Sequence, residues 1–377
     1  MGTTIFAEMS ALAAETGAVN LGQGFPDADG PREIAQLAAD AILAGRGNQY
    51  PPGPGIPELR HAIAWHQKRC YGLDYDPGRE ILVTAGATEA VAAALLALVE
   101  PGDEVIALEP YYDSYAACIA MAGGIRVPVT LRPPAFRPDL DALAAAVTPR
   151  TRLILLNTPH NPTGAVLTPA ELAAVAELAC SRDLLVVTDE VYEHLVFEGE
   201  HVPIASLPGM RERTVTISSA GKTFSFTGWK IGWITASPDL VAAVKTVKQF
   251  LTFVNGGPFQ YAVAEALRLP DTYFTGLRDD LRRKRDLLSA GLAEVGFEVY
   301  RPAGTYFVTT DIRPFGESDG IAFCRELPRR AGVVAVPTAV LYDNKEAGAS
   351  QVRFAFCKRT EVLEEALTRL RRLTRPG

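Results

Sequence analysis

The sequence predicts an α/β protein, with a largely parallel, doubly wound sheet in a large domain and a smaller α+β domain. Three observations predict this fold class. The chain has 377 residues, whereas a typical domain has roughly 150, so two domains or one large domain with an appendage are expected. Short runs that are apolar throughout alternate with longer helical patterns, which favours strands covered on both faces. After Pro258 the pattern changes to a long charged helical stretch followed by short strands.

The strands of the large sheet are predicted from apolar runs. These runs lie at 81–84, 104–108, 125–129, 153–157, 184–189, 214–218 and 231–235. Between them the pattern predicts helices over 89–98, 140–147 and 169–180. The last helix begins with a capping box, because Thr168 can cap it and Glu171 follows three residues later.

The smaller domain is predicted from the C-terminal part of the chain. A charged helix over 273–294 precedes strand candidates at 297–300, 306–311 and 352–357. The first thirty-five residues, rich in Gly and Pro over 22–31, are expected to lie against it. The predicted division is therefore a large domain over 36–270 and a small domain over 1–35 plus 271–377.

Composition and charge indicate which kinds of molecule the protein is expected to bind. The chain has 37 basic and 44 acidic side chains, a net charge of −7 at pH 7, which argues against nucleic acid and against a basic membrane-surface protein. The longest apolar run, 90–99, is about half a membrane span. The five cysteines stand singly, so we expect them to be reduced and to have packing roles. The chain does not begin with a basic stretch followed by an apolar one, and we expect a cytoplasmic protein.

Small and polar residues follow four of the predicted strands, at the edge where open α/β sheets bind ligands. They are Gly86, Ala87 and Thr88 after 81–84, Asn161 after 153–157, Asp189 at the end of 184–189, and Ser219 and Lys222 after 214–218. Together they supply an anion cradle at a helix start, an amide, a carboxylate and an amine.

Pyridoxal phosphate is the cofactor that needs this set. An amine holds its aldehyde as a Schiff base, a carboxylate keeps its ring nitrogen protonated, and hydrogen-bond donors meet its phenolic oxygen. Its phosphate dianion is stabilised by a helix N-terminus with small residues and free N–H groups.

Several longer motifs occur in one order along the chain. They are Asn-Leu-Gly-Gln-Gly-Phe-Pro-Asp at 20–27, Asn-Gln-Tyr at 48–50, Asn-Pro-Thr-Gly at 161–164, Asp-Glu-Val-Tyr at 189–192, Ser-Ser-Ala-Gly-Lys-Thr-Phe-Ser-Phe-Thr-Gly-Trp-Lys at 218–230 and Val-Arg-Phe-Ala-Phe-Cys-Lys at 352–358. In these motifs the sequence resembles the fold-type I pyridoxal-phosphate aminotransferases of class I. The resemblance is to the branch that contains kynurenine, methionine and N-succinyldiaminopimelate aminotransferases.

The resemblance implies a role for each matching residue. Lys222 is the Schiff-base lysine and the base that moves the substrate's α-proton, and Asp189 pairs with the ring nitrogen. Asn161 and Tyr192 contact the phenolic oxygen, Tyr112 stacks on the pyridine ring, and Thr88 also binds the cofactor.

The resemblance also implies which residues bind the phosphate and the substrate. The phosphate is held by Gly86, Ala87, Ser219 and Lys230, together with Tyr50 of a second subunit, which implies a homodimer. Arg353 binds the substrate's α-carboxylate, helped by Gly24 and Asn161. Lys230 stands where many class I members carry Arg, so it offers a point charge in place of a bidentate grip.

The expected activity is transfer of an amino group between an amino acid and a 2-oxo acid by a ping-pong mechanism. Phe-Ala-Glu-Met-Ser-Ala-Leu at 6–12 and Asn-Gln-Tyr-Pro-Pro-Gly-Pro-Gly at 48–55 are most similar to N-succinyldiaminopimelate aminotransferases. This similarity favours lysine biosynthesis, with N-succinyldiaminopimelate as donor and 2-oxoglutarate as acceptor. The alternatives are a broad-specificity kynurenine, methionine or glutamine transaminase and a cysteine-conjugate β-lyase.

Other motifs are interpreted as structural. Gly-Lys-Thr at 221–223 imitates a nucleotide phosphate-binding loop, but Thr216 replaces the first glycine. No His-Glu-x-x-His pair occurs among the five histidines, so no metal site is expected. Glu190 and His194, at helical spacing, are expected to form a polar face, and the basic run 282–285 a solvated one.

Overall fold

Three sheets organise residues 4–373, which are the residues that the computed structural model describes. The largest has seven strands in the order β2-β8-β7-β6-β5-β3-β4. Their bounds are β2 Ile81–Thr84, β8 Gly232–Thr235, β7 Thr214–Ser219, β6 Leu185–Asp189, β5 Thr151–Asn157, β3 Glu104–Glu109 and β4 Ile125–Thr130. Only β8 runs antiparallel to its neighbours, which confirms the predicted largely parallel sheet.

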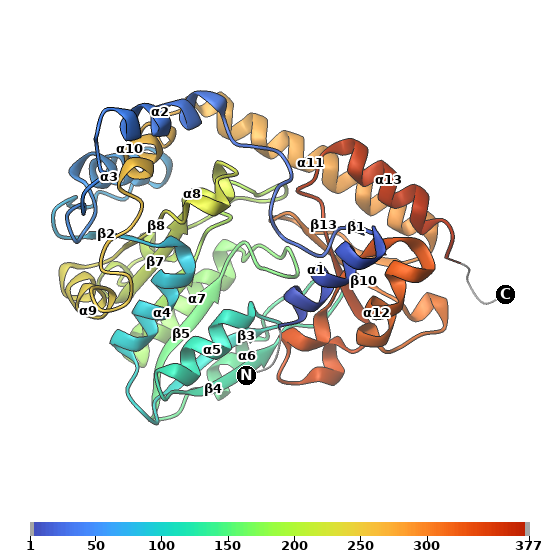
Figure 1. Ribbon diagram of the computed structural model, residues 1–377. Helices are drawn as coiled ribbons and strands as arrows, with labels where there is room; N and C mark the ends of the chain where they lie inside the picture. The colour runs from blue at the N-terminus through green and yellow to red at the C-terminus, as the bar shows by residue number, and fades with distance from the viewer. Residues whose placement is uncertain (1–3, 374–377) are drawn as a thin grey trace.

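Helices cover both faces of this sheet (Figure 1). One face packs against α4 (Gly86–Leu98), α5 (Asp113–Met121) and α9 (Pro238–Lys248). The other packs against α6 (Leu140–Ala145), α7 (Pro169–Ser181), α3 (Pro57–Tyr71) and α10 (Gly257–Ala266), with α2 (Arg32–Leu43) on α10. In β5, Leu153 and Leu155 join the first core and Ile154 and Leu156 the second. This double burial explains why the runs are apolar throughout. The capping box predicted at Thr168 is present in α7.

The prediction that every apolar run is covered on both faces is wrong for β4. Most of its residues are partly or fully exposed, and Ile125 is 44% exposed. The physical reason is its place at the edge of the sheet, where β3 is its only strand neighbour. A sequence pattern does not report the order of strands.

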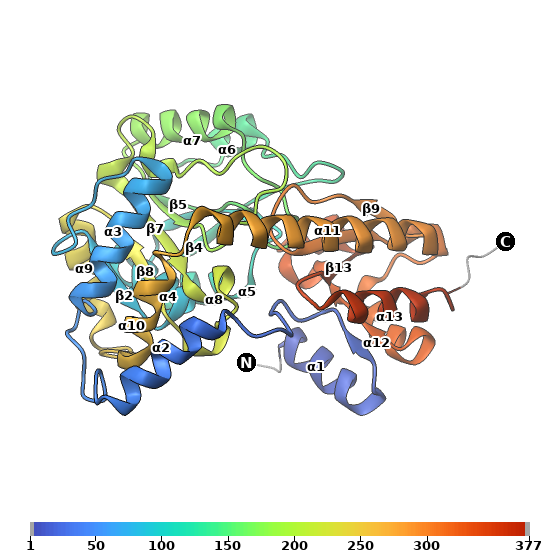
Figure 2. The ribbon, with the colours of Figure 1, turned by 90° about the horizontal axis from the view of Figure 1, so that it is seen from above.

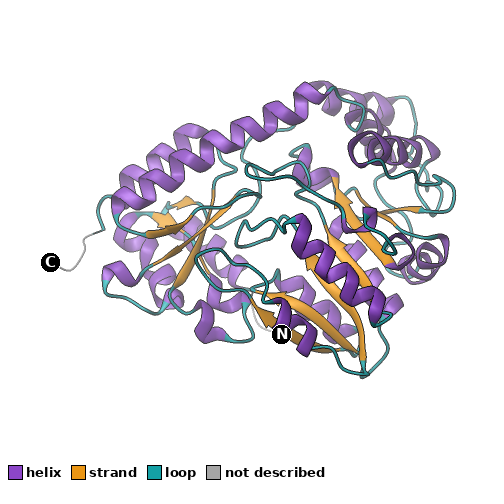
Figure 3. Cartoon of the chain, turned by 180° about the vertical axis from the view of Figure 1, so that it is seen from behind, coloured by secondary structure: helices purple, strands orange, loops and turns teal. Residues whose placement is uncertain are grey.

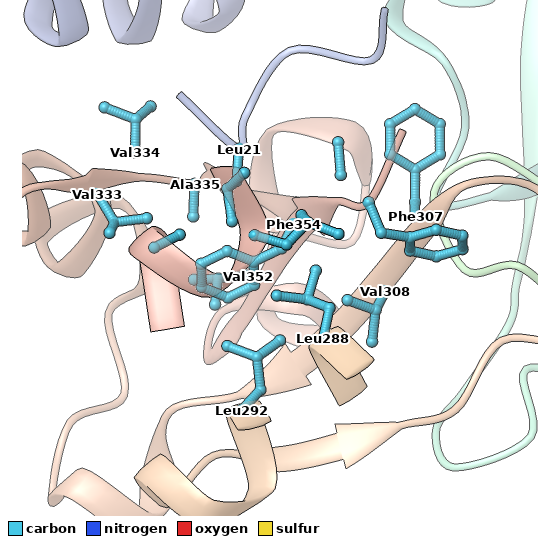
Figure 4. Close-up of a cluster of buried hydrophobic side chains, with 14 of the residues drawn as sticks. Leu21, Leu288, Leu292, Phe307, Val308, Val333, Val334, Ala335, Val352 and Phe354 are labelled. Carbon is cyan, nitrogen blue, oxygen red and sulfur yellow. The ribbon is translucent and has the colours of Figure 1, made fainter. Parts of the chain in front are cut away.

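The second region is built on a four-stranded antiparallel sheet in the order β12-β13-β10-β9. The bounds are β12 Val336–Pro337, β13 Gln351–Ala355, β10 Phe307–Asp311 and β9 Glu298–Tyr300, with helices α11 Asp271–Val295, α12 Gly320–Ala331 and α13 Thr360–Leu370. Figure 4 shows how Leu288 and Leu292 of α11 meet Val352 and Phe354 of β13 in its core.

The N-terminal segment lies against this second region, as predicted. Helix α1 (Ile5–Thr16) packs on α12, and β1 (Val19–Asn20) pairs in parallel with β11 (Val333–Val334). From Arg32 the chain joins the large sheet's helices. The exact division into domains over 36–270 and 1–35 plus 271–377 stays a prediction.

Helix α11 connects the two regions and extends along both (Figures 2 and 3). The expectation of a solvated face over 282–285 is wrong at Arg285, which is 2% exposed. Its guanidinium donates to Glu198 Oε1 and the Pro302 carbonyl at 3.0 Å, and to Asp286 Oδ1 at 2.8 Å. Residues distant in sequence cover the face of α11 that carries Arg285. The run of charged residues at 282–285 therefore gives no sign that Arg285 is buried.

Cysteine packing follows the prediction in part. Cys118, Cys324 and Cys357 are buried, but Cys70 and Cys180 are exposed, so a packing role is wrong for these two. Within the described residues, none of the helices combines the length and apolar character that crossing a membrane requires.

Candidate active site

A pocket of about 400 Å³ lies at the carboxyl ends of the large sheet's strands, beside the N-terminal segment and β13. Its lining contains most of the predicted site residues, from seven separate parts of the chain. These are Gly24, Ala87, Thr88, Tyr112, Asn161, Asp189, Tyr192, Lys222 and Arg353. Gly86, Ser219, Lys230 and Tyr50 are not among the lining residues.

Lys222 lies in the short helix α8 (Ala220–Thr223), directly after β7. Its Nζ is 5.7 Å from the ring centroids of both Tyr192 and Tyr306. Burial lowers the pKa of this amine, and the charges of Arg353 and Lys230 lower it further, against the opposite effect of Cys357 and Asp189. A larger fraction of the amine is therefore neutral than for an exposed lysine, and a neutral amine is the form that attacks a carbonyl or accepts a proton.

Asp189 ends β6 and is buried. Tyr115 Oη donates to its Oδ2 at 2.7 Å, and the Val191 N–H donates to Oδ1 at 3.2 Å. Burial raises the pKa of this carboxyl, while the two hydrogen bonds act in the opposite direction. None of the ion pairs formed between residues 4 and 373 includes Asp189. The carboxylate is thus held in place and left free to face a cationic group of a ligand.

Asp189 and Asn161 are held in position by two residues that carry no sequence motif of their own. Tyr115 is the first. It lies three residues after Tyr112 at the start of α5, a spacing that puts both on one helix face and could have identified it. Asn157 is the second, since its Nδ2 donates to the Asp189 carbonyl and its Oδ1 accepts from the Asn161 N–H, both at 2.8 Å.

Arg353 projects from β13 and is 1% exposed. Its Nη1 donates to Asn161 Oδ1 at 2.8 Å and its Nη2 to the Gly22 carbonyl at 2.9 Å, while Nε has no hydrogen-bond partner among residues 4–373. The guanidinium stacks 4.0 Å from the ring centroid of Phe307. Burial lowers the pKa of Arg353 to about 10, so it stays charged at neutral pH. A buried cation without a carboxylate partner is costly, and an anionic ligand would satisfy it.

The first turn of α4 forms a candidate anion site at one end of the pocket. Ala85, the N-cap, contributes no side-chain hydrogen bond, so the N–H groups of this turn are not capped by it. A Cβ on Gly86, which has a φ of +77°, would lie 3.2 Å from Lys230 Nζ. A Cβ on Gly232 would lie 2.6 Å from the Gly86 carbonyl carbon, so β8 packs directly against this turn. Helix N–H groups and a nearby ammonium group together favour a phosphate-sized anion.

Tyr192 and Tyr112 both line this pocket. Tyr192 is 3% exposed, and burial raises the pKa of its hydroxyl, so it stays protonated and can donate. Burial likewise raises the pKa of Tyr112, which lies at the N-cap position of α5 and contacts Tyr115 edge-on, with ring centroids 5.8 Å apart. Gly24 approaches through its backbone, and its carbonyl accepts from Tyr306 Oη at 2.6 Å.

Tyr50 does not enter the pocket of its own chain. Its side chain is 82% exposed and contacts the Phe253 ring edge-on at 5.4 Å. Phe250 and Leu251, from the same loop as Phe253, are also exposed. Asn255 anchors this loop to the Lys230 carbonyl at 3.1 Å, so the exposed apolar group lies beside the anion end of the pocket.

The polar face expected from Glu190 and His194 is wrong. The residues after β6 form turns, not a helix, and Glu190 is buried with its carboxylate accepting from Thr188 and facing His201 Nε2 at 2.8 Å. Helical spacing was therefore misleading in a segment that turns sharply after a strand.

Comparison with known proteins gives concordant matches over almost the whole chain. Residues 16–370 match the family model of aminotransferases of class I and II. The chain is 56% identical to a probable N-succinyldiaminopimelate aminotransferase of Mycobacterium tuberculosis, over 98% of this chain and 95% of that protein. The solved structure of N-succinyldiaminopimelate aminotransferase from that organism has a TM-score of 0.97 and covers 99% of this chain and 98% of its own. Methionine aminotransferase of Escherichia coli is 43% identical over 99% of this chain and 96% of that protein, and human kynurenine–oxoglutarate transaminase 1 is 37% identical over 97% and 94%.

Proposed function

The chain belongs to the class I and II aminotransferases, has their fold-type I architecture and is a transaminase; from this premise we propose its cofactor, substrates and residue roles. The cofactor is pyridoxal 5'-phosphate. The amino donor is N-succinyldiaminopimelate and the acceptor is 2-oxoglutarate, in a ping-pong cycle that belongs to lysine biosynthesis.

The residues around the pocket fit this cofactor. The buried amine of Lys222 suits the aldehyde of the cofactor. The carboxylate of Asp189, held by Tyr115, suits its ring nitrogen. The uncapped first turn of α4, beside Lys230, suits its phosphate. When bound, pyridoxal 5'-phosphate supplies an aldehyde for the amine and a ring that delocalises the electrons of the substrate's Cα–H bond.

The protein's own groups then have distinct tasks. When the cofactor is bound, Asp189 would keep a proton on its ring nitrogen, and Asn161 Nδ2 and Tyr192 Oη would donate to its phenolic oxygen. Asn161 is oriented for this, since its Oδ1 already accepts from Arg353. Lys222 Nζ takes the proton from the α-carbon of the amino acid in one half of the cycle. It returns a proton to the α-carbon of the incoming 2-oxo acid in the other half. Gly86, Ala87, Ser219 and Lys230 hold the phosphate, and Tyr112 and Thr88 border the ring.

Among residues 4–373, buried Arg353 donates only to neutral oxygens and has no carboxylate partner, and this observation carries the proposal. Its guanidinium lines the pocket with Nε free, and an α-carboxylate of an amino acid is a planar, bidentate partner for it. Gly24 lies in the same lining and contributes backbone contacts. A pocket with a carboxylate-binding cation and a buried amine fits an amino acid better than a plain amine or alcohol.

A panel of amino donors tests the substrate assignment. We expect the largest kcat/KM for N-succinyldiaminopimelate among N-succinyldiaminopimelate, kynurenine, methionine, glutamine and glutamate, each assayed with 2-oxoglutarate. The assignment is supported by the 56% identity to the mycobacterial relative. A higher kcat/KM for kynurenine or methionine would overturn this donor while leaving the transaminase intact.

A broad-specificity transaminase is the second candidate. Phe6, Phe25 and Phe307 line the pocket and would suit aromatic or thioether side chains. The similarity to methionine aminotransferase favours the same alternative. Release of pyruvate and ammonia from a cysteine conjugate, without any 2-oxo acid, would instead identify a β-lyase.

A homodimer is proposed because Tyr50 is exposed beside the anion end of the pocket. Tyr50, Phe250, Leu251 and Phe253 form an apolar surface that a second copy can cover, delivering its Tyr50 hydroxyl to the phosphate. We expect Tyr50→Phe to bind the cofactor about tenfold more weakly and to remain dimeric by analytical ultracentrifugation. A monomer with full specific activity would contradict the proposal.

A cytoplasmic location is also proposed. Its support is that all five cysteines are free, as is typical of proteins in a reducing compartment. Fractionation of producing cells, with detection of the chain outside the cytosolic fraction, would overturn it.

A further inference from the structure

A second cluster of potential ligand groups lies where α3 meets the turn that follows β6. It consists of His66 and Cys70 from α3, and Glu193 and His194 from the turn, and is called here the histidine cluster. It borders a separate pocket of about 420 Å³, none of whose lining residues belongs to the lining of the candidate active site. The transaminase reaction uses none of these four side chains.

The donor atoms of the histidine cluster converge. His66 Nε2 and His194 Nε2 face each other at 2.9 Å, with their rings edge-on. Cys70 follows His66 by one helical turn, and its Sγ lies 3.7 Å from His66 Nε2. The Glu193 carboxylate and the two ring nitrogens lie within 4.8 Å of one another.

We propose that the histidine cluster is a binding site for a divalent transition metal of the zinc type, ligated by His66, His194, Glu193 and Cys70. A tetrahedral zinc ion has bonds of about 2.0 Å to nitrogen and about 2.3 Å to sulfur, which place two nitrogens about 3.4 Å apart and sulfur about 3.5 Å from nitrogen. Cys70 Sγ lies 3.7 Å from His66 Nε2 and 3.9 Å from His66 Nδ1, so it is beside the ring and would have to turn about its Cα–Cβ bond to reach the ion. The two rings would have to separate by about 0.5 Å to admit the ion.

The state of the donors also suits a metal. His66 and Glu193 are 1% and 5% exposed, so the protein interior holds these two donors in place. Glu193 Oε1 accepts from Ser218 Oγ at 2.5 Å. Such a hydrogen bond fixes a ligating carboxylate from outside the metal's coordination sphere.

Charge balance supports a divalent ion. Two neutral imidazoles, one carboxylate and one thiolate would neutralise a 2+ charge, and a mixed nitrogen and sulfur set selects zinc or cobalt over magnesium or calcium. Arg69 is the nearby opposing charge, since it lowers the pKa of both histidines. It is itself paired with Asp271 at 3.2 Å and stacked on Trp65, which reduces its effect on an incoming cation.

A metal ion in the histidine cluster would link two segments of the protein. The bound metal would tie α3 to the turn that begins at Asp189 and carries Tyr192. It would therefore stabilise the protein without contacting the reactants. This inference does not depend on the identity of the amino donor.

Cobalt binding to the cofactor-loaded enzyme tests the proposal. After chelator treatment and dialysis, we expect one Co²⁺ per chain by equilibrium dialysis, with visible d–d absorption of a tetrahedral site and displacement by Zn²⁺. His194→Gln should weaken binding at least about 100-fold. Cys70→Ser should still bind but lose the sulfur-to-cobalt charge-transfer band. His61→Gln, exposed on the same helix, and Cys180→Ser, an exposed cysteine elsewhere, are the matched controls.

Each outcome decides the question. Stoichiometric Co²⁺ that is lost in His194→Gln and retained in both controls supports the site. Because Cys70 is exposed, Cys70→Ser is expected to fold even if His194→Gln does not, and its band change then carries the test. No Co²⁺ bound above the background of the controls would overturn the site, and the two histidines would then share only a hydrogen bond. Binding that is the same in the ligand variants and the controls would also overturn it.

Discussion

The two largest fully buried side chains of the described molecule are both arginines, and their surroundings differ. Arg285 donates to the carboxylates of Glu198 and Asp286 and to the Pro302 carbonyl. Arg353 donates only to an amide oxygen and a backbone carbonyl, and its Nε is unpartnered. The first charge is satisfied within the protein and serves the fold. The second is left for a ligand, which identifies a binding site without reference to any relative.

Lys222, like Arg353, is a buried cationic residue that lines the pocket. Of the substitutions considered, its removal should reduce activity most. We expect Lys222→Ala to reduce kcat by about 10³-fold or more, because the nucleophile and the proton-transfer base are lost together. The thermal midpoint of the cofactor-free protein should not fall, since a desolvated amine is removed. Single-turnover kinetics and calorimetry measure the two effects, and turnover close to that of the unmodified enzyme would refute the role of this lysine.

Arg353→Gln should reduce kcat/KM for amino acids by about 100-fold, equivalent to about 2.7 kcal/mol. The glutamine amide can still donate one hydrogen bond, but it cannot pair with a carboxylate. Steady-state kinetics provide the measurement, and the free energy of unfolding should change little. A large loss of stability with unchanged kcat/KM would place Arg353 in the same class as Arg285.

Arg285→Met should show the opposite pattern. The Pro302 carbonyl loses its donor and two carboxylates lose a partner, so the free energy of unfolding should fall by about 2 kcal/mol. The kcat/KM should stay within about twofold of the original value. Arg283→Met is the matched control, because Arg283 is exposed on the same helix and pairs with partly exposed Asp280. We expect its free energy of unfolding in urea to change by about 0.5 kcal/mol or less.

A shift in pH dependence is the smallest expected effect. The rate at which cofactor-free protein combines with pyridoxal 5'-phosphate should rise with pH as the Lys222 amine loses its proton. Its midpoint should lie below 10.5, because burial lowers the pKa of Lys222. Arg353 lowers that pKa further, so Arg353→Gln should move the midpoint to higher pH. Arg285→Met should not move it, and equal shifts in both variants would show that the effect is not specific to the pocket.

The large sheet and most of the pocket could be predicted from the sequence because the same physical cause acts on both. Strands buried on two faces give apolar runs, and the ends of parallel strands collect the ligand-binding residues, so Asp189 and Lys222 are marked by position alone. The sequence pattern of β8, in contrast, does not reveal that this strand runs antiparallel to its neighbours. Several helices were not predicted, including α1, α2, α3 and α12, and in α12 Pro328 interrupts the helical pattern that would have indicated it.

Contacts between segments distant in sequence could not be predicted from the sequence. Tyr115 is recognisable as a site residue only when its hydroxyl meets Asp189, and Arg285 as buried only when Glu198 and Pro302 cover it. His66 and His194 lie 128 positions apart, so no local metal-binding motif could predict their convergence. Spacing along one element is readable from a sequence, whereas proximity between elements requires the fold.

The close packing of Gly232 against Gly86 has a consequence for engineering. A methyl group at Gly232 would collide with the backbone of the first turn of α4, and Gly86 has a φ of +77°, which side-chain-bearing residues rarely adopt. Libraries that aim to accept an altered cofactor should therefore keep both glycines. Diversity introduced at Ser219 and Lys230 would change the chemistry around the anion while preserving the backbone that shapes it.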